Sequence, residues 1–291
     1  MTIQDALERA KQLRRTRDGG QPTTRVDRPQ RPPDDDTASP AIRDERPLVE
    51  PAPVSYPGLD RVVFDHEECR KRRVLVTEQQ LREMGSAAAA VRQLRSRVLH
   101  RMRSGGWSCI GITSSGAGDG KTLTAVNLAI SIAREQQRDV YLLDLDMRNP
   151  SVFESLGAQP PRPLSQYFAE NLAPEQVLFA TEFERLMLAG NRDLVRNASE
   201  LLASPKLDEL LAYIRRRAPG AAIIIDLPPA ISTDEALVVA PRTDALFFVV
   251  CEGKTRREGL ARAINLLSDF PMAGIIMNRA SEELGQEYYA Y

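Results

Sequence analysis

Six uninterrupted apolar runs, separated by stretches with helical spacing, constrain the fold of this 291-residue chain more than any other feature. A strand covered on both faces needs apolar residues at every position, whereas a half-exposed strand alternates apolar and polar ones. The pattern therefore predicts an α/β fold, a mostly parallel sheet covered by helices on both faces, with ligands bound at the carboxyl ends of its strands. The runs are Ser108–Thr113, Val140–Asp144, Leu186–Gly190, Ala221–Asp226, Ala245–Val250 and Ala273–Asn278.

The first 60 residues differ in composition from the rest of the chain. They hold nine of the 20 prolines among mixed charges, a composition that does not build a packed core. Within them, Thr2–Arg15 places its apolar residues on one helical face. We expect a short amphipathic helix, docked on its own domain or on a partner, within a disordered leader at residues 1–60. Residues 61–284 are expected to form one globular domain, followed by a tail at 285–291.

Short elements are expected ahead of the first core strand. Arg61–Asp65 reads RVVFD and suits a short edge strand. Thr77–Gln80 has the T-x-x-Q pattern of a capping box, and Ala87–Met102 repeats apolar residues at helical spacing. We therefore expect one or two helices before the core.

Charge and hydropathy exclude two classes of protein. The chain has 39 Lys and Arg against 40 Asp and Glu, so it lacks the basic surplus of a nucleic-acid-binding domain. No stretch reaches the roughly 18 apolar residues of a membrane span, and the N-terminus lacks the apolar core of a secretory signal. Its three cysteines have no metal-ligand spacing and suit a reducing compartment. We expect a cytoplasmic protein with no nucleic-acid partner and no transmembrane segment of its own.

A glycine-rich turn links the first apolar run to a helical stretch. Gly111–Ala133 reads GITSSGAGDGKTLTAVNLAISIA, the strand–loop–helix order of a P-loop. Backbone N–H groups of such a loop surround the β-phosphate of a nucleotide, Lys121 can neutralise phosphate oxygens and the Thr122 hydroxyl can bind Mg²⁺. The consensus has glycine at position 115, where this chain has Ser115. A glycine-rich turn without nucleotide is therefore the alternative.

Three carboxylates follow strands at the edge where a metal–nucleotide site needs them. Asp144 and Asp146 end one apolar run, two positions apart and hence on the same side, and Asp226 ends another. Carboxylate oxygens are ligands that Mg²⁺ prefers, and Asp226 is placed to hold a water on that ion. Together with the P-loop, they predict that the chain binds a nucleotide with Mg²⁺.

These motifs, taken in order, resemble those of the bacterial tyrosine kinases, the polysaccharide-biosynthesis tyrosine autokinases. The resemblance spans about residues 92–291 and rests on the P-loop, D-x-D-x-R-x-P at Asp144–Pro150, D-x-P-P at Asp226–Pro229 and a lesser match at Asn197–Leu207. It implies that the nucleotide is ATP, with ATP-dependent phosphorylation of C-terminal tyrosines linked to capsule or exopolysaccharide assembly and export. It also implies a membrane chain-length regulator as partner, which would recruit the chain to the inner face of the membrane, and a homo-oligomer in at least one state.

The resemblance also implies catalytic roles. Lys121 takes the P-loop role, and one of Asp144 and Asp146 accepts the tyrosine proton. We favour Asp146 beside the acceptor and Asp144 beside the metal. Arg148 would bind phosphate or a neighbouring subunit.

The binding residues follow from the same motifs. Asn278 matches the place where related ATPases contact adenine, although a polar residue ending a strand also suits a turn cap. The expected metal ligands are Thr122, Asp144 and Asp226. The expected nucleotide contacts are Asn278 and the loop residues Ser115, Gly116, Ala117, Gly118, Asp119, Gly120, Lys121, Thr122 and Leu123.

Three of the seven tyrosines lie within the last four residues, in the sequence GQEYYAY. Tyr288, Tyr289 and Tyr291 are the expected phosphoacceptors, because a chain end of this kind can enter the active site of a neighbouring molecule. An aromatic tail packed on the body of its own domain is the alternative.

Two departures separate this chain from patterns it otherwise matches. The kinase family carries E-x-x-R-x-x-R on its oligomer-forming helix, and here Ala89 precedes Arg92 and Arg95, so ring assembly lacks one ionic partner. Partition and division-site ATPases, which share the P-loop, carry a second lysine early in the loop where this chain has Gly116. A switch ATPase of that type is the runner-up function, and a nucleotide-bound scaffold in polysaccharide export is the third.

Overall fold

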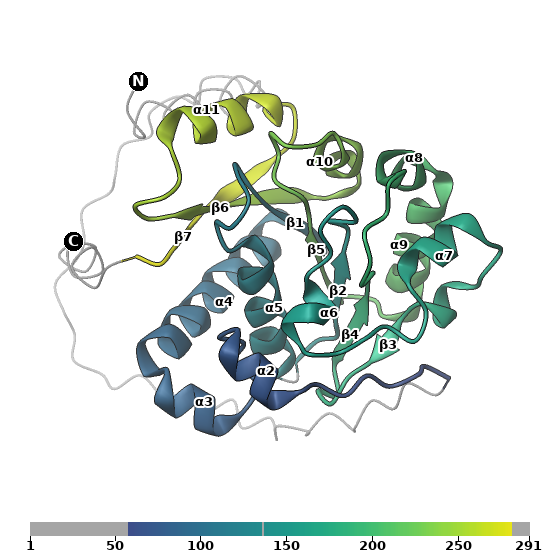
Figure 1. Ribbon diagram of the computed structural model, residues 1–291, viewed down its shortest axis with the longest axis horizontal. Coiled ribbons are helices and arrows are strands. Elements are labelled where there is room, and N and C mark those ends of the chain that lie inside the picture. The colour runs from purple at the N-terminus through teal and green to yellow at the C-terminus, as the bar shows by residue number, and fades with distance from the viewer. Residues whose placement is uncertain (1–57, 136, 281–291) are drawn as a thin grey trace, which may run out of the picture. The chain divides into compact units, whose positions relative to one another are not determined.

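The computed structural model describes residues 58–135 and 137–280 (Figure 1). These residues belong to the larger of two compact units, Glu50–Tyr291. The Thr2–Arg15 helix, residues 1–57 of the expected leader and the three C-terminal tyrosines therefore lie outside the described residues.

A seven-stranded sheet forms the centre of the described unit, in the order β3-β4-β2-β5-β1-β6-β7. All neighbouring strands are parallel except β3 and β4. Asp144 lies opposite Asp226 across the β2–β5 pair, so two of the predicted carboxylates share one register position. The strands are β1 (Cys109–Ser114), β2 (Val140–Asp144), β3 (Phe179–Ala180), β4 (Leu186–Ala189), β5 (Ala222–Asp226), β6 (Ala245–Cys251) and β7 (Met272–Asn278).

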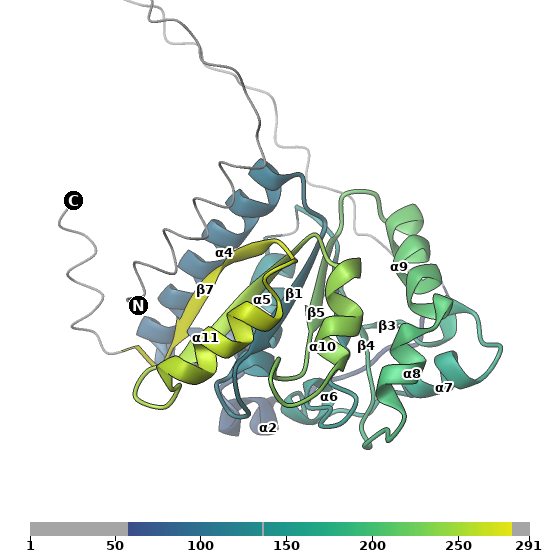
Figure 2. The ribbon, with the colours of Figure 1, turned by 90° about the horizontal axis from the view of Figure 1, so that it is seen from above.

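Helices cover both faces of the sheet, as the uninterrupted apolar runs predict. Along β6, Leu246 and Phe248 pack into one apolar cluster while Phe247 and Val249 pack into the other. Figure 2 shows α4 (Gly85–Gly105) and α5 (Lys121–Ala133) on one side of the strands and α9 (Pro205–Arg217) on the other. The remaining helices are α2 (His66–Lys71), α3 (Glu78–Glu83), α6 (Val152–Ser155), α7 (Leu164–Ala169), α8 (Ala198–Ala203), α10 (Glu235–Val239), α11 (Arg257–Leu266) and the 3₁₀ turns Pro174–Gln176 and Ala240–Arg242.

The segments ahead of β1 confirm one prediction and correct another. Thr77 and Gln80 form the predicted capping box at the start of α3. The expected edge strand at Arg61–Asp65 is wrong, because only Arg61 makes an isolated bridge, to Ala180 of the two-residue β3. Asp65 instead caps α2 by accepting bonds from the next turn's N–H groups.

Candidate functional site

The P-loop wraps the start of α5, and two of its glycines have backbone angles that favour glycine. Gly118 and Gly120 have φ angles of 76° and 93°, in the left-handed region. A Cβ on Gly120 would lie 2.0 Å from the Asn278 side-chain nitrogen, which donates to the Asp119 carbonyl over 3.0 Å. The end of β7 is thus bound to the loop. Contact of Asn278 with adenine stays a prediction.

Ser115, which replaces the consensus glycine, joins a network inside the loop. The buried Asp119 carboxylate accepts bonds from the Ser115 hydroxyl at 3.3 Å and from the Gly116 N–H at 3.2 Å. The loop therefore accommodates serine at the consensus glycine position, and the serine side chain stabilises the turn.

The structure brings Lys121, Thr122, Asp146 and Asp226 together at the carboxyl ends of β1, β2 and β5. The Lys121 ammonium lies 2.7 Å from an Asp146 carboxylate oxygen and 3.6 Å from one of Asp226. Thr122 donates its hydroxyl to the same Asp226 oxygen over 2.6 Å. The side chains of the ionic group are at most 9% exposed, so their charges interact in surroundings that screen them weakly.

Asp144 is fixed by backbone donors. One of its oxygens accepts the N–H groups of Ser151 and Val152, both over 2.9 Å, and the other accepts the Asp146 N–H over 3.2 Å. Ser151 also donates its hydroxyl to Thr122 over 3.0 Å. Our sequence reasoning missed Ser151, whose only signal was its place directly after Pro150 of the motif.

Burial and like charge shift the acid–base equilibria of the cluster. Burial, reinforced by the neighbouring charge of Asp226, raises the pKa of Asp144 to about 8. Burial also raises the pKa of Asp226, against the pull of Lys121. For Lys121, burial lowers the pKa, but the charges of Asp226 and Asp146 outweigh it and raise the pKa overall. Lys121 therefore stays charged, beside more carboxylates than it can neutralise.

This crowding of carboxyl groups around one ammonium fits a site for a divalent cation, which would displace the protons that the raised pKa values retain. The second oxygen of Asp226 is buried and has no hydrogen-bond partner among the described residues. Within residues 58–135 and 137–280, no group of three or more His, Cys, Asp or Glu side chains is arranged to hold a metal ion by itself. Mg²⁺ commonly binds through one or two carboxylates, with substrate phosphates and waters as its remaining ligands. Thr122, Asp144 and Asp226 therefore suit the ion of a metal–nucleotide complex.

Comparison with known proteins agrees with this geometry. The ParA family, described as NUBPL iron-transfer P-loop NTPase, matches residues 107–283. The tyrosine-protein kinase YwqD of Bacillus subtilis is 31% identical over 182 residues, which cover 62% of this chain and 76% of that protein. The tyrosine-protein kinase CpsD of Streptococcus agalactiae is 27% identical over 180 residues, covering 60% and 75%. The crystal structure of the VpsO kinase domain superposes with a TM-score of 0.60 at 26% identity, covering 69% and 98%.

The chain belongs to the bacterial tyrosine kinases. Through its family match, it also belongs to the ParA group of P-loop NTPases. The motif order thus identified the family correctly. None of the helices described here is long and apolar enough to cross a membrane.

Arg148 of the kinase lies beside the cluster with a partner that the sequence did not suggest. Its Nε bonds Glu235 over 2.5 Å, and the Glu235 side chain is 1% exposed against 48% for Arg148. A buried carboxylate thus orients a half-exposed guanidinium. The expected binding of Arg148 to phosphate or to a second subunit stays a prediction.

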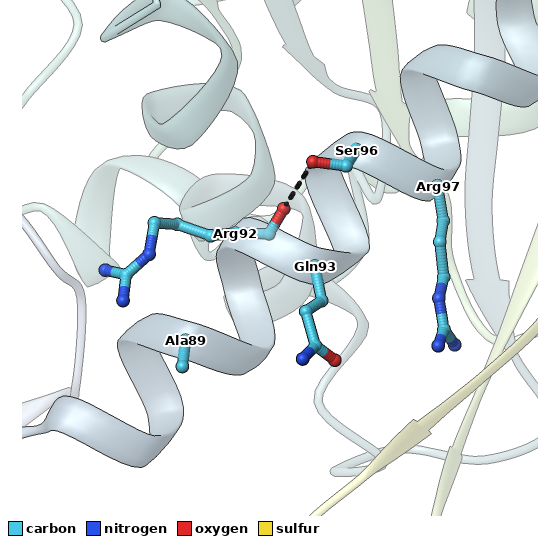
Figure 3. Close-up of a pocket in the computed structure, with 5 residues that line it drawn as sticks. All are labelled: Ala89, Arg92, Gln93, Ser96 and Arg97. Carbon is cyan, nitrogen blue, oxygen red and sulfur yellow. Dashed lines mark hydrogen bonds between the residues drawn. The ribbon is translucent and has the colours of Figure 1, made fainter. Parts of the chain in front are cut away.

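Arg92 and Arg95, which match the family's oligomer-forming motif, lie on α4, and a role of this helix in assembly stays a prediction. Figure 3 shows a hollow on its outer face, lined by Ala89, Arg92, Gln93, Ser96 and Arg97. Arg95 lies elsewhere, because it pairs with Glu135 over 2.5 Å and donates to the Ser131 carbonyl. One of the two motif arginines is therefore bound within its own chain.

Proposed function

We propose that this kinase uses Mg·ATP to phosphorylate Tyr288, Tyr289 and Tyr291 of a neighbouring copy. The observation that carries the proposal is the buried pairing of Lys121 with Asp146 and Asp226 beside a P-loop. This cluster combines a cation for phosphate with carboxylates for a metal and for a proton. Phosphoryl transfer depends mainly on such positioning and charge neutralisation.

The hydrogen bonds support a division of labour between the two motif carboxylates. Both oxygens of Asp144 accept backbone N–H groups, whereas Lys121 is the cation bound to Asp146. When Lys121 turns to the phosphates, it releases an Asp146 oxygen that can accept the tyrosine proton. Thr122, Asp144 and Asp226 would hold Mg²⁺, which supplies further charge neutralisation at the phosphate oxygens.

We further propose that the kinase regulates capsule or exopolysaccharide synthesis and export. Its partner would be a membrane chain-length regulator that recruits it to the inner face of the membrane. The support is the similarity to the tyrosine-protein kinases YwqD and CpsD, together with the motif order on which the family resemblance rests.

Incubation with Mg·ATP, with and without the cytoplasmic segment of a chain-length regulator, tests the activity. Intact mass and peptide mapping should find phosphate on Tyr288, Tyr289 or Tyr291, and Lys121→Met should remove it. Mixing a Lys121→Met chain with an active chain whose three tail tyrosines are phenylalanine tests transfer between copies. In that mixture, only the Lys121→Met chain should gain phosphate.

The ParA family match favours one second candidate, a switch ATPase of the partition type. That protein would release free phosphate and leave the tail unmodified, even with the regulator segment present. The same incubation therefore separates the two functions.

A further inference from the structure

The loop between β6 and α11 brings a second lysine to the P-loop. Lys254 donates its ammonium to the Ala117 carbonyl over 2.8 Å, although the two residues lie 137 positions apart. A Cβ on Gly118 would lie 2.3 Å from the same nitrogen, so the ammonium rests directly on the Gly118 backbone.

The root of Lys254 is held in place by a tight turn. Its N–H bonds the Cys251 carbonyl over 3.1 Å, and the Thr255 hydroxyl accepts the Cys251 N–H over 2.8 Å. Gly253, at φ 71°, allows the reversal. The turn thus fixes the backbone of Lys254, while its exposed side chain is held by one bond, to the Ala117 carbonyl.

The P-loop backbone that Lys254 contacts has no cation of its own ahead of Lys121. Residues 115–120 contain no cation, and their only ionisable side chain is the acidic Asp119. No ion pair within the described residues joins Lys254 to a carboxylate, so a neutral carbonyl is the partner of its ammonium. A charge-assisted bond to a phosphate is stronger than one to a neutral carbonyl.

We propose that Lys254 is a second nucleotide-binding lysine, whose ammonium moves from the Ala117 carbonyl to the phosphate chain of the bound nucleotide. The inference rests on the proposed use of ATP. Because P-loop N–H groups surround the phosphates, an ammonium on this backbone reaches them by rotation of its own side chain. Lys254 then binds ground state and transition state alike, which lowers KM without raising kcat.

A purely structural clip would behave differently. If Lys254 only fastened the loop, its loss would weaken the binding of ADP and ATP by one factor, because both carry the β-phosphate that the loop surrounds, and added salt would leave that factor unchanged. A phosphate contact instead predicts an effect that grows from AMP to ATP and shrinks as salt screens the charges.

Equilibrium titration of the full chain with AMP, ADP and ATP tests the proposal. Lys254→Met should weaken ATP binding by about tenfold and ADP binding less, with AMP unchanged. Lys254→Arg should retain most of the affinity, since it keeps the charge. Arg256→Gln, which removes an exposed cation two residues away, is the matched control and should bind ATP like the parent.

A second substitution, within the P-loop itself, restores the positive charge that Lys254→Met removes. Gly116 is not in the left-handed region, and a Cβ there meets nothing closer than 4.0 Å, so a lysine fits. Gly116→Lys should restore ATP affinity to Lys254→Met. Unchanged ATP affinity in Lys254→Met, equal weakening for ADP and ATP, or a double variant no better than Lys254→Met would each overturn the proposal. Binding requires no phosphate transfer, so this result stands apart from the proposed kinase activity.

Discussion

The two sides of the P-loop differ in how they hold it. On one side, the central strands β2 and β5 supply Asp144 and Asp226, which are fully buried beside Lys121. On the other, Asn278 of β7 and Lys254 of the β6–α11 loop each donate to one backbone carbonyl of the P-loop. The buried side therefore holds the ionic cluster of the site. The open side instead fixes the backbone of the loop.

This difference predicts how substitutions will act. Breaking a buried ion pair leaves an uncompensated charge in a weakly screened place, which costs both folding and chemistry. Losing an exposed bond to a carbonyl costs little, because water replaces the lost partner. Stability should thus respond mainly to the buried side, and nucleotide affinity to both.

Lys121→Met should show the largest effect. It leaves Asp146 and Asp226 without their cation, so we expect phosphate transfer to fall by roughly 10²–10³ or more and the free energy of unfolding to fall by about 3–5 kcal/mol at neutral pH. Mass analysis of the tail and denaturant unfolding measure the two effects. Lys254→Met is the control, with stability within about 0.5 kcal/mol of the parent. Equal destabilisation by the two variants would show that the buried and the open side of the P-loop contribute alike to stability.

A pH dependence of stability should follow from Asp144. Its pKa is about 8 in the folded chain, against about 4 in the unfolded one. Between these values the folded state binds more protons, so its stability falls as pH rises, by on the order of a few kcal/mol, and levels off above about pH 8. Mg²⁺ competes with the same proton, so its affinity should rise across this window.

Unfolding of the parent and of Asp144→Asn at several pH values, without nucleotide, isolates this contribution. From pH 5 to pH 8, the free energy of unfolding of the parent should fall relative to that of Asp144→Asn. A difference that is flat or moves the other way would show that Asp144 is ionised in the folded state throughout.

The sequence predicted the fold well because burial on both faces leaves a clear pattern. Six of the seven strands were predicted to within one or two residues, whereas β3 was missed because two residues carry no periodicity. Arg61–Asp65 has the composition of a strand, but it meets β3 at one bridge, and its last residue, Asp65, is the N-cap of α2. Local pattern alone does not reveal whether a partner strand exists.

The candidate site was predictable only where a motif names the residue. Lys121, Thr122, Asp146 and Asp226 converge as expected, because their spacing reflects strand ends. Glu235 and Lys254 reach the site across 87 and 137 positions, and no local pattern links them to it. Gly190 was recognised only as the end of a run, although it packs against Asp144.

Gly190→Ala tests how tightly the buried side is packed. The new Cβ would lie 2.8 Å from the Asp144 Cβ and 3.2 Å from the Phe153 ring. Such overpacking should cost about 1–3 kcal/mol in denaturant unfolding. Gly85→Ala is the control, since nothing lies within 4 Å of its Cβ at the start of α4. If Gly190→Ala were as stable as that control, the buried side would not be tightly packed around Gly190.

Asn278→Ala should show the smallest effect and tests the open side. It removes the bond from the Asn278 amide to the Asp119 carbonyl and the bond that the Asn278 amide oxygen accepts from the Arg279 N–H, and it opens space beside Gly120. One such bond contributes about 0.5–1.5 kcal/mol, so nucleotide affinity should fall by roughly two- to tenfold while the unfolding midpoint barely moves. Asn278→Asp should be no better, because a carboxylate cannot donate to the carbonyl. A large loss of stability in either variant would show that the open side also supports the fold, and the two sides would then differ in exposure but not in role.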